Sequence, residues 1–192
     1  MRREYDAYYT DPRMVTPMLD VVGPYGRICE PCVGQGDILR HMTWKLPECQ
    51  FVTNDINPRI LAEYQEDARD PDAKFLKRVD WFISNPPFNQ ATDIMQNLWQ
   101  HANIGMAMLL RITYAEPCLD RGEWLQEMSD HQRYFIPLHP RHNFRKGEIN
   151  PATGKEYGGG FTTVAWFVWA KEFKWSRSNM TSPFRYITKW RD

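Results

Sequence analysis

Residues 80–88 read Asp-Trp-Phe-Ile-Ser-Asn-Pro-Pro-Phe and contain the strongest candidate for chemistry in the chain. The apolar run at 81–83 predicts a short buried strand, which has to stop at Asn85-Pro86-Pro87-Phe88. Neither proline has an N–H to continue a sheet or a helix interior, and Pro86 holds Asn85 in an extended conformation. The stretch therefore predicts a stiff corner that presents an amide side chain, bare carbonyls and an aromatic ring.

Such a corner suits the methylation of an exocyclic amino group. The lone pair of an adenine or cytosine amino nitrogen is delocalised into the ring, which makes the nitrogen a poor nucleophile. Hydrogen bonds from its two N–H groups to the Asn85 side-chain oxygen and the Pro86 carbonyl would aim the lone pair at a methyl donor. Phe88 would stack on the base. The competing interpretation is a strand that ends in a Pro-Pro turn beside a core phenylalanine.

A second candidate site begins at Glu30, where residues 27–30 predict a strand. The segment 30–37, Glu-Pro-Cys-Val-Gly-Gln-Gly-Asp, leads into apolar residues at helical spacing. A strand, a Gly-x-Gly loop and a helix predict a nucleotide-binding crossover, in which Gly34 and Gly36 allow close backbone approach. Glu30 ends the strand where it can meet an amino group of a ligand. The third glycine of the dinucleotide fingerprint is missing, and no Gly-Lys-Ser/Thr of a P-loop follows.

Residues 50–55 predict a second strand, and it ends in the acid Asp55. In this type of sheet, that carboxylate accepts hydrogen bonds from the ribose hydroxyls of a bound nucleotide. A helix cap or turn beside Asn57-Pro58 would also explain Asp55. Only a clipped helix or a turn fits between Asp55 and the next acidic stretch, which contains Asp67.

The order of these signals resembles that of S-adenosylmethionine-dependent amino methyltransferases, over roughly residues 8–170. Within them the chain is most similar to the small phage and prophage DNA adenine-N6 methyltransferases. The resemblance implies direct methyl transfer, with no metal or catalytic cysteine, at a corner made of Asn85, Pro86, Pro87 and Phe88. It implies that S-adenosylmethionine contacts Tyr9, Thr10, Glu30, Pro31, Gly34, Gly36, Asp37, Asp55, Ile56, Asp67, Ala68 and Asn85.

The expected fold is α/β, a Rossmann-like class I methyltransferase domain over residues 1–170. We expect a mostly parallel seven-stranded sheet with a final antiparallel hairpin strand and helices on both faces. Apolar patterns predict strands at 27–30, 50–55, 81–83, 104–110, 133–138 and 162–169. Helical spacing predicts helices at 12–22, 38–42, 94–102 and 124–128.

The segment 139–160 is polar and rich in glycine, and we expect it to be a substrate loop within the domain. Basic residues around an aromatic ring fit phosphate contact and base stacking, although a solvated hairpin loop fits as well. The candidate substrate-binding residues are Phe88, Arg141, His142, Phe144, Arg145 and Lys146. Residues 171–192 form a basic, aromatic tail that either packs on the domain or contacts nucleic acid.

Composition sets the remaining expectations. The formal net charge is zero, with 24 basic and 24 acidic residues, so overall charge does not indicate a nucleic-acid partner. The sequence shows no membrane span and no signal-peptide core. Few cysteines suggest a reduced, cytoplasmic protein, and the resemblance to phage and prophage enzymes implies a bacterial or phage-infected cell. Cys29 and Cys32 have the spacing of redox and zinc sites, but no second ligand pair accompanies them, so we expect buried, inert thiols.

The substrate stays open at this stage. Nucleic acid is the expected partner, DNA rather than RNA, and a partner subunit could supply target recognition. RNA adenine methylation, methylation of a protein glutamine amide and a non-catalytic subunit of a methyltransferase complex are the alternatives. Cytosine N4 is chemically equivalent to adenine N6 at such a corner, so the choice of base comes from the resemblance. Duplex DNA would require the target base to be flipped out.

Overall fold

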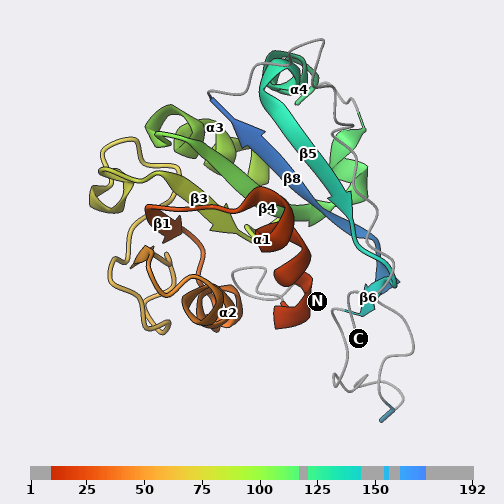
Figure 1. Cartoon of the computed structure of the whole chain (residues 1–192), viewed down its shortest axis with the longest axis horizontal. Coiled ribbons are helices and arrows are strands. Elements are labelled where there is room, and N and C mark those ends of the chain that lie inside the picture. Colours follow the sequence, from red (N-terminus) through yellow and green to blue (C-terminus); the bar gives the residue numbers. More distant parts are fainter. Residues whose placement is uncertain (1–9, 117–120, 144–153, 156–160, 172–192) are drawn as a thin grey trace.

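A computed structural model describes residues 10–116, 121–143, 154–155 and 161–171 (Figure 1). Within these ranges one sheet of six strands has the order β2-β1-β3-β4-β8-β5. The strands are β1 (Arg27–Glu30), β2 (Gln50–Thr53), β3 (Trp81–Ser84), β4 (Gly105–Arg111), β5 (Gln132–Pro137) and β8 (Val164–Ala170). A separate two-stranded ribbon joins β6 (His142–Asn143) to β7 (Phe161–Thr162).

The pairing confirms a mostly parallel sheet that ends in an antiparallel hairpin. The neighbours β2, β1, β3 and β4 pair in parallel, whereas β8 pairs antiparallel with both β4 and β5. All of the predicted strand runs are found. Seven strands were expected, whereas the sheet of the described residues has six. Between Asp55 and Asp67 the chain forms turns, as predicted, and a single parallel bridge joins Asn54 to Tyr64.

The helices are short and overlap the predicted runs. They are α1 (Thr16–Val22), α2 (Asp37–Lys45), α3 (Ala91–His101) and α4 (Gly122–Met128). The expected helix over 12–22 is divided into a 3-10 turn at Pro12–Met14 and α1. The Asp11 side chain caps that turn by accepting from the Arg13 amide, and Gly23 ends α1 in a left-handed conformation.

Helices cover both faces of the sheet, because alternate strand residues point to opposite sides. Ala107 and Leu109 of β4 belong to the core that contains α1 and α2. Met106 and Met108 belong to the core that contains α3 and α4. Every residue of β8 is buried, as a strand covered on both faces requires.

The parallel strands all end at one edge of the sheet, here called the carboxyl edge. Glu30, Asp55 and Asn85, which the sequence analysis singled out, end or follow β1, β2 and β3 at this edge, and Arg111 ends β4 there. No helix of the described residues is long and apolar enough to cross a membrane.

Candidate active site

The ends of β1, β2 and β3 surround a pocket at the carboxyl edge. The space between its walls is about 410 Å³, counting the part open to solvent. Because β1 lies between β2 and β3, the pocket occupies the point where the strand order reverses, the usual place for a nucleotide. Six residues predicted from the sequence line the pocket: Pro31, Asp55, Ile56, Asp67, Ala68 and Pro87. The sequence analysis did not predict the other four lining residues, Cys32, Glu66, Gln90 and Ile94.

Two glycines shape the loop between β1 and α2. Gly34 and Gly36 have φ angles of 52° and 74°, in the left-handed region that favours glycine. Gly36 caps α2, and Asp37 is the first residue of that helix. The Gly34 N–H donates to the Asp55 carboxylate at 2.8 Å. The predicted loop and the predicted acid are therefore in direct contact.

Asp55 is buried and holds backbone groups of two loops. One carboxylate oxygen accepts from Gly34, and the other accepts from the Asn57 N–H at 2.9 Å. Each carboxylate oxygen has a further lone pair, and the residue lines the pocket. The arrangement therefore leaves acceptor capacity for the hydroxyls of a ribose.

Asn54 is a structural residue of the site that the sequence analysis did not identify. Its side chain is fully buried and donates to the Pro31 and Glu66 carbonyls at 3.0 Å each. Its side-chain oxygen accepts from the Glu66 N–H at 2.9 Å. Asn54 thus fixes two walls of the pocket to each other. A polar residue beside Asp55 at the end of an apolar run was the available signal.

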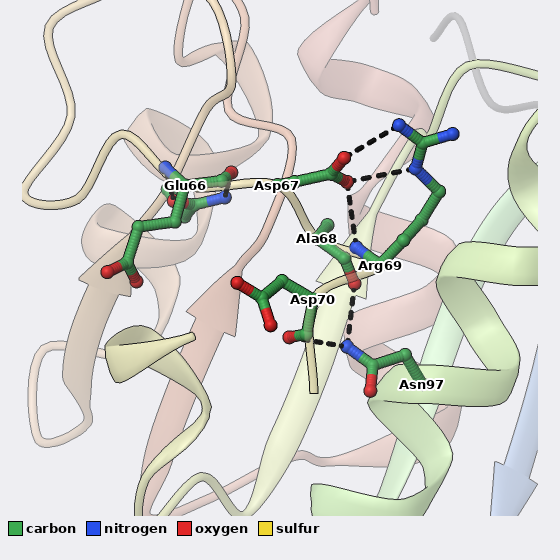
Figure 2. A network of polar contacts seen from close by, with 7 residues as sticks. Glu66, Asp67, Ala68, Arg69, Asp70 and Asn97 are labelled. Carbon is green, nitrogen blue, oxygen red and sulfur yellow. Dashed lines mark hydrogen bonds and ion pairs between the residues drawn. The ribbon is translucent and has the colours of Figure 1, made fainter. Parts of the chain in front are cut away.

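Asp67 lies in the pocket wall, but its carboxylate is already paired. Figure 2 shows that carboxylate pointing toward Arg69, whose guanidinium donates at 2.6 and 2.9 Å. Hydrogen bonds from the Arg69 side chain lower the pKa of Asp67. Asn97 of α3 supports the same loop by donating to the Ala68 and Asp70 carbonyls at 2.9 and 3.1 Å (Figure 2). A ligand group at Asp67 would share the carboxylate with Arg69.

Glu30 is a buried acid that forms no ion pair with a described residue. Its side chain is 2% exposed, and its Oε2 atom has no hydrogen-bond partner among the described residues. Burial raises the pKa of Glu30 well above its usual range, and the neighbouring Asp37 and Asp55 carboxylates raise it further. The backbone N–H of Leu39, in the first turn of α2, donates a hydrogen bond to Glu30 and lowers its pKa in part. A buried carboxylate oxygen with no partner suits the ammonium group of a ligand.

Thr10, which precedes α1, holds the predicted catalytic corner, residues 85–88. The Asn85 side-chain amide donates to the Thr10 hydroxyl at 3.0 Å, and Thr10 is itself buried. This contact leaves the Asn85 carbonyl oxygen to accept from a substrate. The Thr10 amide donates to the Asp37 carboxylate, although burial still raises the pKa of Asp37 overall. Thr10 therefore links the glycine loop to the corner.

The rest of the corner combines a buried proline with a half-buried ring. Pro86 is buried, while Pro87 and Phe88 are partly exposed. Pro87 lines the pocket, so the corner and the pocket are continuous. Phe88 packs against the core, and the Arg111 guanidinium lies over its ring at 4.8 Å from the centroid.

The two cysteines of the Cys-x-x-Cys spacing are free. Cys29 is fully buried as expected, and burial raises the pKa of its thiol. Cys32 is only partly buried and lines the pocket, which corrects the expectation that both thiols lie inside the core. Burial raises the pKa of Cys32 as well, so both thiols stay protonated and unreactive. The described residues contain no His, Cys, Asp or Glu cluster suited to a metal.

Several predicted residues fall outside the described part of the chain. These are Tyr9, Phe144, Arg145 and Lys146, together with the tail at 172–192. The backbone of His142 is described as part of β6, and Arg141 is exposed. The predicted substrate loop therefore stays a prediction.

No known protein-family profile and no curated protein sequence matches the chain, but solved structures share its fold. The methyltransferase subunit of a type I restriction-modification system from Streptococcus thermophilus has a TM-score of 0.59 at 12% identity, over 86% of this chain and 45% of that one. A SAM-dependent O-methyltransferase from Thermotoga maritima has a TM-score of 0.55 at 13% identity, over 92% and 70%. The tRNA methyltransferase TrmI from Aquifex aeolicus has a TM-score of 0.51 at 10% identity, over 88% and 73%.

The fold is that of the Rossmann-like methyltransferases. The TM-scores of 0.51–0.59 establish the architecture. At identities of 10–13% the substrate has to be inferred from the residues of the site. The chain spans less than half the length of the restriction-modification subunit.

Proposed function

We propose that this chain is an S-adenosylmethionine-dependent methyltransferase that modifies the N6 amino group of adenine in nucleic acid, with DNA as the preferred substrate. The observation that carries the proposal is the continuity of pocket and corner. Pro87 lines the pocket, and Asn85 two residues earlier is oriented by Thr10. A donor in the pocket and an amino group at the corner would then lie side by side.

Residues that line the pocket, together with Glu30, which directly precedes the lining residue Pro31, suit the chemical groups of S-adenosylmethionine. The buried Oε2 of Glu30 has no partner and suits the ammonium group of the amino-acid part. Asp55 keeps acceptor capacity for the ribose hydroxyls, and Ile56 offers an exposed apolar side chain beside it against which an adenine ring can pack. When bound, the cofactor supplies an electrophilic methyl group on sulfur.

The chain contributes positioning and polarisation. The Asn85 side-chain oxygen and the Pro86 carbonyl accept from the two N–H groups of the substrate amine, which localises the nitrogen lone pair. Pro86 and Pro87 keep the corner stiff, since neither ring can rotate about φ. Phe88 holds the base plane by stacking. The raised thiol pKa values of Cys29 and Cys32 argue against a covalent cysteine step.

Adenine and DNA are the finer parts of the proposal. They rest on the resemblance of Asn85-Pro86-Pro87-Phe88 and the preceding loops to small DNA adenine methyltransferases. The structural likeness to a restriction-modification subunit and to a tRNA methyltransferase supports nucleic acid as the substrate class. We further propose that the segment 139–160, or a partner subunit, provides target recognition.

Methyl transfer from labelled S-adenosylmethionine tests the proposal when duplex DNA, single-stranded DNA and structured RNA are offered in parallel. Isolation of N6-methyladenine from DNA is the expected result. Label found only in RNA would move the assignment to RNA. Label found only in N4-methylcytosine would change the base, and label found only in added protein would exclude nucleic acid as the substrate.

A further inference from the structure

Arg111 occupies an exposed place next to the catalytic corner. It is the last residue of β4 and the only exposed residue of that strand. The register pairs Ser84 with Met108, so Arg111 lies further along β4 at the carboxyl edge, beyond the level at which β3 ends. No motif identified in the sequence includes it.

The Arg111 side chain returns toward the corner instead of extending into solvent. Its guanidinium lies over the Phe88 ring at 4.8 Å from the centroid, within the distance of a cation–π contact. Phe88 also packs against the core, and Arg111 is exposed. The planar cation therefore covers a part of the ring that faces the surface.

Arg111 also differs from Arg40 and Arg69 in its charge partners. Arg69 is paired with Asp67, and Arg40 is paired with Asp37. Among the described residues, no ion pair with a carboxylate involves Arg111. An exposed guanidinium of this kind is well suited to a phosphate, which it can bind through two parallel N–H groups.

We propose that Arg111 binds the backbone phosphate of the nucleotide whose base stacks on Phe88. The guanidinium covers the ring in the free protein, and the incoming base takes over that contact while the cation moves to the phosphate. This inference rests on the proposed function, because it takes a nucleic acid as the substrate. It assigns a substrate-binding residue that the sequence motifs do not include.

Binding of fluorescein-labelled adenine-containing oligonucleotides to Arg111→Gln, followed by anisotropy at several salt concentrations, tests the inference without requiring turnover. We expect binding about tenfold weaker, because one charge-assisted hydrogen bond is lost. The slope of log affinity against log salt concentration (the salt slope) should be smaller in magnitude by about one. Arg111→Lys should retain most of the affinity. Arg78→Gln removes the same charge at the opposite edge of the sheet, before β3, and should bind like the wild type.

The outcomes separate the inference from the proposed function. The role of Arg111 would be overturned if Arg111→Gln kept the affinity and salt slope of the wild type. It would also be overturned if Arg78→Gln lost as much affinity as Arg111→Gln. Both conclusions hold even if methylation is observed. Weaker binding with a reduced slope would support Arg111 even if no methyl transfer is found. A wild-type protein that binds no oligonucleotide would overturn both. In kinetics, KM for nucleic acid should rise while kcat and KM for S-adenosylmethionine stay unchanged.

Discussion

A hydrogen bond of 3.0 Å joins the side chains of Thr10 and Asn85, which are 75 residues apart in the sequence. It directs the amide nitrogen of Asn85 toward Thr10, so the carbonyl oxygen is the atom left for a substrate. The Thr10 hydroxyl therefore orients the amide of Asn85.

Replacing that hydroxyl should reduce turnover without removing cofactor binding. Thr10→Val keeps the shape of the side chain but cannot hold the Asn85 amide, so we expect kcat to fall about threefold to tenfold, the equivalent of one hydrogen bond. KM for S-adenosylmethionine should change little, because the Thr10 backbone contact to Asp37 remains. Thr10→Ser should restore kcat. A Ser variant as slow as the Val variant would show that packing, not the hydroxyl, matters.

Glu30 should make the stability of the cofactor-free protein depend on pH. Burial raises its pKa in the folded state well above the usual range, so the folded protein retains a proton that the unfolded chain releases. The resulting stabilisation is fully present below the unfolded pKa of ~4.3 and is lost as pH rises through the folded value.

Glu30→Gln removes this dependence while keeping the shape of the side chain. We expect its Tm without cofactor to equal or exceed that of the wild type at neutral and higher pH, with the advantage disappearing toward pH ~4. Its affinity for S-adenosylmethionine should be lower, since the partner for the ammonium group is lost. Calorimetry across pH, with and without cofactor, measures both effects. A variant that is less stable than the wild type at every pH would contradict this account of Glu30.

Asp55→Asn should weaken cofactor binding more than it weakens the fold. The amide has one acceptor oxygen, so its NH₂ group must face either the Gly34 or the Asn57 N–H that the carboxylate now accepts. We expect affinity for S-adenosylmethionine to fall about tenfold or more by titration calorimetry. Asp20→Asn changes the same charge at an exposed position of α1 and serves as the matched control. Equal affinities for the two variants would remove Asp55 from the pocket chemistry.

Asn54→Ala should be among the most destabilising single changes at the site. It leaves the buried Pro31 carbonyl and the partly buried Glu66 carbonyl and N–H without their partner. We expect the free energy of unfolding to fall by about 2–4 kcal/mol in urea titrations. Asn103→Ala removes one exposed hydrogen bond to Asp80 and should cost less than about 1 kcal/mol. A loss for Asn54→Ala no larger than for Asn103→Ala would contradict the bracing role.

The residues that end strands were predictable from the sequence, because an apolar run fixes where a parallel strand stops. Glu30, Asp55 and Asn85 each follow such a run, so their meeting at one edge follows from the strand order. The contact between Gly34 and Asp55 also follows from the strand order, because each residue comes shortly after one of two neighbouring parallel strands. The fold class and the hairpin formed by β5 and β8 were also predictable from apolar patterns.

Other features depend on contacts that no local pattern contains. The Thr10 contact to Asn85 and the Arg111 contact to Phe88 arise only when distant segments meet in the folded chain. In the sequence, Asn54 is an ordinary residue at the end of a strand. Only the folded structure shows the three backbone groups to which its side chain hydrogen-bonds. The parallel bridge between Asn54 and Tyr64 is likewise a contact that no local pattern predicts.

The central claim is that Asn85 polarises an amino group for methyl transfer, and Asn85→Ala tests it most directly. Turnover on nucleic acid should be measured with labelled S-adenosylmethionine, and cofactor affinity should be measured by calorimetry on the same samples. We expect kcat to fall by about 10²–10³, as for the loss of one group that stabilises a transition state, with cofactor affinity close to that of the wild type. Near-normal turnover of Asn85→Ala would contradict the mechanism.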